Sequence, residues 1–280
     1  MTVTDLDPST PAVQRHDAGS GTVAYRRVGT GRPVLLLHSA GGANEWGPLQ
    51  LGLAGVADLI APDHPGFGLS DDLPELHTVD DLVYHYLDLL DALGLPQVDV
   101  VGLSFGGWVA AELAMHSPER VRRLVLGAAV GLRIPEAPIA DLFLMTPPQL
   151  MRALFHDEAL VSAALSAVPT TEGILATYRD LGALARFGWH PFLNDPKLER
   201  RLHRITAPTL VLAAGEDRLV PRAHAERYAA RIPDAELRDI PDCGHALHGE
   251  RPAEVTAAIV EHLGGRRSEA ELDLETGAET

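Results

Sequence analysis

Short apolar runs alternate with helical patterns along most of the chain. Several of these runs are continuously apolar, as in parallel strands that are covered on both faces. They lie at 34–37, 57–61, 98–101, 124–126, 209–213 and 235–240. Ahead of them, 13–18 and 22–28 flank Gly19-Ser20-Gly21, which predicts a β-hairpin. Strands that alternate with helices predict an α/β fold whose central sheet is mostly parallel, with right-handed crossovers.

Two of the intervening helices have clear signals at their ends. Thr78 can cap a helix whose apolar positions form one face, and Gly94 can end that helix. Pro252 suits the first turn of a closing helix that places Val255 and Ile259 on one side. Both helices are therefore expected to pack one face on the sheet.

The segment 132–204 breaks this alternation. It contains seven prolines and short helical patches but no convincing strand. We predict a helical cap here, inserted between two parts of an α/β core at 13–131 and 205–264. The polar sequences at 1–12 and 265–280, the second of them acidic, predict disordered tails.

Composition and charge narrow the classes of function. The 280 residues include 39 acidic and 23 basic side chains, and the resulting net charge of −16 would repel nucleic acids and anionic lipid surfaces. A single cysteine, Cys243, excludes an internal disulfide and a cysteine-based metal cluster. The sequence has neither a signal-peptide core nor an apolar run near the roughly 20 residues that span a bilayer. We expect a soluble cytoplasmic protein that binds neither nucleic acid nor membrane.

A candidate nucleophile follows the apolar run 98–101. The run leads into Gly102-Leu103-Ser104-Phe105-Gly106, and a helical pattern comes next. Gly-x-Ser-x-Gly between a strand and a helix is the pattern of a nucleophile elbow. Side chains in place of the two glycines would collide with backbone in so tight a turn, and the serine must adopt strained torsions. The sequence therefore predicts Ser104 as a nucleophile; a glycine-rich turn without chemistry is the alternative.

A serine hydroxyl needs a base that accepts its proton, and that base needs an acid behind it. His245 follows the last strand pattern, and Asp217 follows the strand pattern before it. The order Ser104, Asp217, His245 is the one expected for a nucleophile elbow of this kind. His248 competes as the base, and Glu216 competes weakly as the acid, because in an extended loop it would point elsewhere.

The tetrahedral intermediate of such a reaction needs two preorganised hydrogen-bond donors. We expect one to be the N–H of Phe105, at the start of the helix after the nucleophile. The other is expected in the loop after 34–37, at the N–H of Ala40. A glycine-rich turn alone would not explain why His38 closes an apolar run.

These motifs together resemble the α/β-hydrolase superfamily, in particular its small esterase, lactonase and C–C hydrolase members. The likeness covers about residues 20–264. The motifs are Leu37-His38-x-x-Gly, Asp63-His64-Pro65-Gly66-Phe67-Gly68-Leu69-Ser70, the elbow at Ser104, Gly-x-Asp217-x-x-Val-Pro and Gly244-His245. The resemblance implies the α/β-hydrolase fold, a Ser-Asp-His triad and a helical cap.

The chain departs from the family's pattern at two positions. Ser39 stands where the family usually has glycine directly after the loop histidine, and Ala246 stands where C–C hydrolases typically carry an aromatic residue. A serine nucleophile also differs from the aspartate of epoxide hydrolases and haloalkane dehalogenases. The resemblance is thus closest to serine-dependent members.

The leading expectation is hydrolysis of a carboxylic ester or lactone of a small to medium apolar molecule, through an acyl-Ser104 intermediate. Cleavage of a carbon–carbon bond beside a carbonyl is the alternative, and a non-catalytic ligand-binding protein is the third hypothesis. We expect no cofactor and no metal, because metal-ligand and dinucleotide motifs do not occur. Pocket candidates are Trp46, Phe143, Phe155 and Trp189, although an apolar cap could instead form a dimer surface. The sequence leaves the natural substrate and the oligomeric state open.

Overall fold

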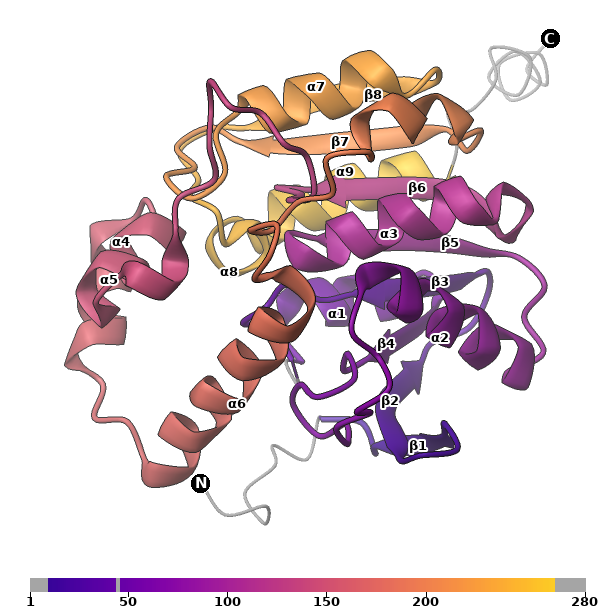
Figure 1. Ribbon diagram of the computed structural model, residues 1–280, viewed down its shortest axis with the longest axis horizontal. Helices are drawn as coiled ribbons and strands as arrows, with labels where there is room; N and C mark the ends of the chain where they lie inside the picture. The colour runs from indigo at the N-terminus through magenta and orange to yellow at the C-terminus, as the bar shows by residue number, and fades with distance from the viewer. Residues whose placement is uncertain (1–9, 44–45, 265–280) are drawn as a thin grey trace, which may run out of the picture.

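A single eight-stranded sheet forms the centre of the molecule (Figure 1). The computed structural model describes residues 10–43 and 46–264, so the acidic C-terminal tail and most of the N-terminal tail lie outside the described residues. The strand order is β1-β2-β4-β3-β5-β6-β7-β8. The strands are β1 Gln14–Asp17, β2 Thr22–Val28, β3 Pro33–Leu37, β4 Asp58–Pro62, β5 Val98–Leu103, β6 Val121–Gly127, β7 Thr209–Ala214 and β8 Ala235–Ile240.

The sheet is parallel apart from its first edge. β1 pairs antiparallel with β2, which confirms the predicted hairpin, and β2 pairs antiparallel with β4. All pairs from β4 through β8 are parallel. Parallel strands carry their carboxyl ends to one edge of the sheet, which is where ligands bind in such folds. This confirms the predicted α/β-hydrolase fold class.

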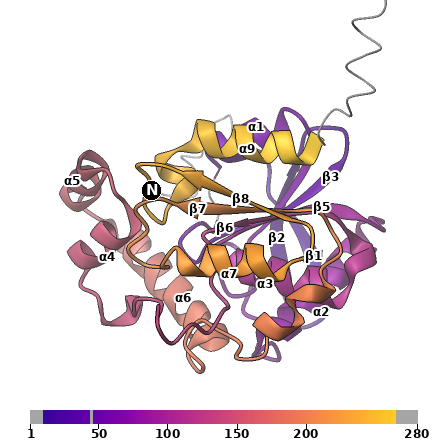
Figure 2. The ribbon, with the colours of Figure 1, turned by 90° about the horizontal axis from the view of Figure 1, so that it is seen from above.

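Helices cover both faces of the sheet (Figure 2). One face packs on α1 Pro48–Ala54 and α9 Pro252–Gly264, and the opposite face packs on α2 Val79–Ala92, α3 Phe105–His116 and α7 Ala223–Arg231. Two separate apolar clusters therefore form, one on each side of the strands. α3 is buried from its first residue to Met115, as expected for a helix in the centre of one layer.

The predicted cap on α2 is present. Thr78 Oγ1 accepts a hydrogen bond of 3.1 Å from the N–H of Asp81, while the Asp81 carboxylate accepts from the N–H of Thr78 at 2.8 Å. Gly94, just beyond the helix, has φ of +68°. Glycine is favoured there because this torsion strains other residues.

The chain between β6 and β7 is helical. It contains α4 Pro147–Leu154, α5 Glu158–Ser166, α6 Thr171–Gly188 and two 3-10 turns at Leu142–Leu144 and Glu199–Arg204. Its β-pairing, within the described residues, is an isolated bridge between Gly131 and Asn194 near the two ends of the segment. Among the described residues, no single helix is long and apolar enough to cross a membrane; α5 and α6 together pass the length and composition test only as a pair bent by 119°.

Candidate active site

The turn that carries Ser104 has the strained geometry of a nucleophile elbow. β5 is buried throughout, and Ser104 lies between its end and the first residue of α3 with φ of +51°. A Cβ atom at Gly102 would lie 2.3 Å from the carbonyl oxygen of Gly106, and one at Gly106 would lie 2.2 Å from that of Leu37. Only glycine fits at either position, so the two glycines are needed for the turn itself.

The structure brings the three predicted catalytic residues together. His245 Nε2 lies 2.8 Å from Ser104 Oγ, and His245 Nδ1 lies 2.8 Å from Asp217 Oδ2. The side chains of His245 and Asp217 are each 4% exposed. The other Asp217 oxygen accepts the N–H groups of Leu219 and Val220, both at 2.8 Å. These bonds hold the carboxylate so that one oxygen faces the imidazole.

The topology explains why residues so distant in sequence meet. Ser104 follows β5, Asp217 follows β7 and His245 follows β8, and these strands run parallel in one sheet. Each residue therefore leaves the same edge of the sheet. The two competitors lie elsewhere: Glu216 is exposed, and its N–H donates to Cys243 at 2.9 Å. His248 lies in the short helix α8 Leu247–Glu250.

A buried histidine pair, which sequence analysis did not single out beyond His38, fixes the loop after β3. The N–H of His64 donates to His38 Nε2 at 2.8 Å, and His64 Nε2 lies 3.0 Å from the carbonyl oxygen of His38. His64 Nδ1 makes a short hydrogen bond with the hydroxyl of Tyr86. Burial lowers the pKa of His64 well below its ordinary value, so the ring is neutral. These contacts assign its proton to Nε2, with Nδ1 accepting from Tyr86.

The same loop lies beside the first turn of α3. The carbonyl oxygen of His38 also accepts the N–H of Gly106, at 3.1 Å. Phe105 begins α3, where backbone N–H groups have no partner within the helix. Ala40 lies in a turn closed by a bond of 2.9 Å from the N–H of Gly42 to the carbonyl of Ser39. The N–H groups of Phe105 and Ala40 stay our predicted oxyanion donors.

Helix α6 is attached to the loop after β4. Arg179 donates to the carbonyl oxygen of Gly68 at 2.8 Å, and the N–H of Gly68 donates to Asp180 Oδ1 at 3.0 Å. Burial raises the pKa of Asp180 above its ordinary value, and the hydrogen bond from Gly68 opposes that effect. Farther along α6, the Phe187 ring packs against that of Phe105 with centroids 6.2 Å apart. The helical segment thus reaches the residue after the nucleophile.

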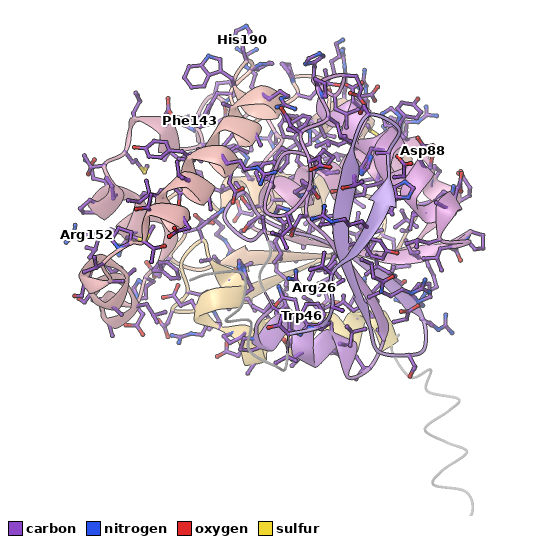
Figure 3. All side chains as sticks on the ribbon, turned by 90° about the horizontal axis from the view of Figure 1, so that it is seen from below. Arg26, Trp46, Asp88, Phe143, Arg152 and His190 are labelled. Carbon is purple, nitrogen blue, oxygen red and sulfur yellow. The ribbon has the colours of Figure 1, made fainter. Side chains whose placement is uncertain are left out.

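The four side chains that we predicted for a substrate pocket do not gather in one place. Trp46 packs on the cluster of α1 and α9, and Figure 3 shows it well apart from Phe143. Phe143 instead packs at a tilt against Trp189, with centroids 5.2 Å apart, and Trp189 is 61% exposed. The Phe155 ring lies beside Gly249 in α8. We therefore take Phe187, 7% exposed, as the aromatic side chain through which the helical segment faces the elbow.

Within 10–43 and 46–264, no group of three or more histidine, cysteine, aspartate or glutamate side chains is arranged to hold a metal ion. Cys243 is buried and free, two positions before His245. The hydrogen bonds that join Ser104, His245 and Asp217 support the chemistry of an activated serine hydroxyl at the sheet edge.

Comparison with known proteins assigns the chain to a family. Residues 32–252 match the family model described as the alpha/beta hydrolase fold. The chain belongs to this family, and within it to the hydrolases. It is 34% identical to the 2-hydroxymuconate semialdehyde hydrolase of Pseudomonas putida, over 84% of this chain and 88% of that protein.

Two further similarities are of the same kind. The 2-hydroxy-6-oxo-2,4-heptadienoate hydrolase of Pseudomonas putida is 31% identical over 84% of this chain and 90% of that relative. The solved structure of 2-hydroxy-6-oxo-6-phenylhexa-2,4-dienoate hydrolase from Rhodococcus sp. strain RHA1 superposes with a TM-score of 0.74 at 25% identity. That match covers 91% of this chain and 99% of the other. These relatives favour the C–C hydrolase alternative over the ester or lactone hydrolase that we expected first.

Proposed function

We propose that this hydrolase cleaves a carbon–carbon bond beside a carbonyl group in a 2-hydroxy-6-oxo-dienoate. The observation that carries the proposal is the 34% identity to a 2-hydroxymuconate semialdehyde hydrolase over 88% of that relative. The Ser104–His245–Asp217 hydrogen bonds support it, because they supply the nucleophile and the proton carrier that such a cleavage needs. Ester or lactone hydrolysis becomes the second candidate.

The proposed steps use the hydrogen-bonded residues at the elbow. His245 Nε2 accepts the proton of Ser104 as Oγ attacks the 6-oxo carbon, and the N–H groups of Phe105 and Ala40 receive the oxyanion. Before cleavage the substrate must ketonise: the 2-hydroxyl loses its proton and C5 gains one, so C5 becomes tetrahedral beside a C3=C4 bond conjugated with the 2-oxo group. The C5–C6 bond then breaks, and its electron pair delocalises through C3=C4 onto the 2-oxygen to give a dienolate. The imidazolium of His245 gives its proton to this leaving dienolate. Water, deprotonated by His245, releases the second carboxylic acid from Ser104.

Asp217 contributes to both halves of this reaction without binding substrate. Its Oδ2 accepts from His245 Nδ1, which directs Nε2 toward Ser104 and stabilises the imidazolium. The N–H groups of Leu219 and Val220 keep the carboxylate in this orientation. Glu216 is exposed to solvent, and the partner of His245 Nδ1 is Asp217.

Ala246 keeps ester hydrolysis as a second candidate. The C–C hydrolases that the chain resembles typically carry an aromatic residue after the catalytic histidine, and a methyl group leaves that part of the site wider. The N–H of Ala246 donates to the carbonyl of Leu154 at 2.9 Å, so the position is held against the end of α4. A wider site would accept an ester or lactone of larger volume.

Absorbance distinguishes the two candidates. We would supply purified enzyme with 2-hydroxymuconate semialdehyde and 2-hydroxy-6-oxo-2,4-heptadienoate, and follow loss of the absorbance of the conjugated system. p-Nitrophenyl esters of graded chain length and a lactone panel would be measured in parallel, with Ser104→Ala as the control. We expect kcat/KM for one dienoate to exceed that for every ester by about 100-fold or more.

Two other results would replace the proposal. Ester or lactone turnover with an unchanged dienoate spectrum would restore ester hydrolysis. Failure of a fluorophosphonate probe to label Ser104, together with no turnover of any substrate, would favour the non-catalytic binding protein.

A further inference from the structure

The loop after β3 is held by the side chain of the residue that begins it. His38 directly follows β3 and is 7% exposed. Its Nδ1 lies 2.6 Å from the carbonyl oxygen of the next residue, Ser39. The N–H of Gly42 donates to the same oxygen at 2.9 Å. Two contacts therefore fix the direction of the Ser39 carbonyl.

The other nitrogen of the His38 ring shows where its proton lies. The N–H of His64 donates to His38 Nε2 at 2.8 Å. Because a backbone N–H can only donate, Nε2 is an acceptor and carries no proton. The neutral ring then carries its proton on Nδ1, so Nδ1–H donates to the Ser39 carbonyl. The contact between His38 and Ser39 is thus a hydrogen bond that orients the backbone.

The Ser39 carbonyl belongs to the same peptide unit as the N–H of Ala40. In a trans peptide these two groups point in opposite directions, so a donor that holds the carbonyl also sets the direction of the N–H. The N–H of Ala40 is one of the two donors that we predict for the oxyanion. Such donors are effective because their direction is fixed before the charge develops.

The main chain of His38 joins this loop to the nucleophile elbow. Its carbonyl oxygen accepts from His64 Nε2 at 3.0 Å and from the N–H of Gly106 at 3.1 Å. Gly106 lies in the first turn of α3, one residue after Phe105, whose N–H is the other predicted donor. The segments that carry the two donors are therefore attached to each other through His38.

We propose that His38, held by His64, is a positioning residue for the oxyanion hole. Its Nδ1–H holds the Ser39 carbonyl and so directs the N–H of Ala40 toward the oxyanion. The inference rests on the proposed reaction at Ser104. It does not depend on which bond is cleaved, because C–C and ester cleavage both pass through an oxyanion.

A role in packing alone makes a different prediction. The His38 ring also packs against His64 and Phe67, with centroids 4.0 Å and 5.5 Å away. His38→Asn and His38→Leu both remove this ring and the acceptor for the His64 N–H, and the two new side chains have the same branching. Only asparagine keeps a donor in the place of Nδ1. Leucine should give the more stable protein, because asparagine buries polar atoms.

The two variants should therefore rank oppositely in activity and in stability. We would measure urea unfolding, the second-order rate at which a fluorophosphonate labels Ser104, and kcat and KM on the best dienoate or ester. His38→Asn should keep the labelling rate and kcat within about fivefold of the wild type, and His38→Leu should lower both by about 30-fold or more. KM should change by less than about threefold in either, since an oxyanion donor acts on the transition state.

Tyr86→Phe tests the contact behind His64. The Tyr86 hydroxyl donates to His64 Nδ1, and without it the proton can move to Nδ1 and leave the His38 carbonyl without that donor. We expect kcat to fall by about three- to tenfold. Thr209→Val is the control, because it removes an equally buried hydrogen bond, of 2.8 Å to the Ala207 carbonyl, at the start of β7. Its kcat should change by less than about twofold.

Several results would overturn the inference. Equal labelling rates in His38→Asn and His38→Leu, or a faster rate in His38→Leu, would show that His38 acts through packing. Equal kcat in Tyr86→Phe and Thr209→Val would overturn the role of His64. A wild type that is labelled but does not cleave dienoates would end the C–C hydrolase proposal alone, since the labelling rates still test His38. A wild type that is not labelled would contradict the reaction at Ser104 and this inference with it.

Discussion

His245 Nδ1 and Asp217 Oδ2 lie 2.8 Å apart although 28 residues separate them in the chain. The contact depends on β7 and β8 being adjacent and parallel, with six paired positions that bring their carboxyl ends level. It also depends on the turn after β7, in which the N–H groups of Leu219 and Val220 hold the carboxylate. The proposed catalytic pair is thus a product of sheet register and one local turn.

Removal of the Ser104 hydroxyl should abolish covalent catalysis and leave the fold intact. A φ of +51° strains the backbone of alanine as much as that of serine, so Ser104→Ala should leave the strain at this turn unchanged. We expect kcat to fall by about 10⁴ to 10⁶ on the best substrate, while circular dichroism and thermal unfolding match the wild type. Wild-type kcat in this variant would contradict an acyl-Ser104 intermediate.

His245 and His248 provide a matched pair for the base. His245 contacts both Ser104 and Asp217, whereas His248 lies in the short helix α8. His245→Ala should therefore lower kcat about as much as Ser104→Ala, because residues that act as a unit are not additive. His248→Ala should be milder by at least roughly tenfold. The reverse order of severity would show that the base is misassigned.

Local sequence was sufficient for the elbow and the three residues of the proposed triad. The need for glycine at positions 102 and 106 arises within one turn of five residues. Parallel strands then bring Ser104, Asp217 and His245 to one edge of the sheet. The His64–Tyr86 contact could not be predicted in this way, because it joins the loop after β4 to the middle of α2. A signal did exist, since His38 directly follows β3 and His64 follows β4 by two positions.

The pocket residues were harder to predict for the same reason. Phe143, Phe155 and Trp189 all have the apolar character of a cap side chain, and only the path of α6 decides which aromatic residue reaches the elbow. That path is set by long-range contacts such as Arg179 with Gly68. Trp189 lies one residue beyond α6 and turns to the surface, while Phe187 turns inward.

Substrate choice should accordingly depend on Phe187 and hardly on Trp189. Phe187→Leu retains most of the buried apolar volume but removes the ring that packs on Phe105. We expect it to change the ratio of kcat/KM between a small and a bulky substrate by about tenfold, equivalent to roughly 1–3 kcal/mol of lost contact. Trp189→Leu is the control, since the ring is 61% exposed, and its ratio should change by less than about twofold. If the ratio of kcat/KM changes equally in both variants, the conclusion is that α6 does not line the substrate pocket.

Cys243 should be unreactive in the folded enzyme despite its closeness to His245. It is fully buried, and burial raises the pKa of its thiol to about 12, so the thiolate is scarce at neutral pH. Ellman's reagent should label far less than one equivalent under native conditions and one equivalent in guanidinium chloride. Because the chain has a single cysteine, the stoichiometry is unambiguous. Rapid labelling without loss of structure would show that the loop before His245 opens.

Glu112 should make stability fall as the pH rises. Burial raises the pKa of its carboxyl to about 7 from an ordinary 4.5, against the hydrogen bond from Trp108. Between these two values the native state binds more protons than the unfolded state, so the free energy of unfolding decreases with increasing pH across that window. Glutamine keeps an oxygen that can accept from Trp108 Nε1 and cannot ionise.

Urea unfolding of Glu112→Gln at pH 5 and pH 8 tests this sign. We expect the variant to match the wild type closely at pH 5 and to exceed it at pH 8, by up to on the order of 3 kcal/mol. His116 Nε2 lies 3.7 Å from the Glu112 carboxylate, and a positive charge there would favour the ionised carboxyl and so reduce the difference. Glu119→Gln, an exposed position on the same side of the sheet, should change stability by less than about 0.5 kcal/mol at either pH. The opposite result is that the stability of Glu112→Gln relative to the wild type falls between pH 5 and pH 8. It would mean that the native carboxyl is ionised and stabilised by its neighbours.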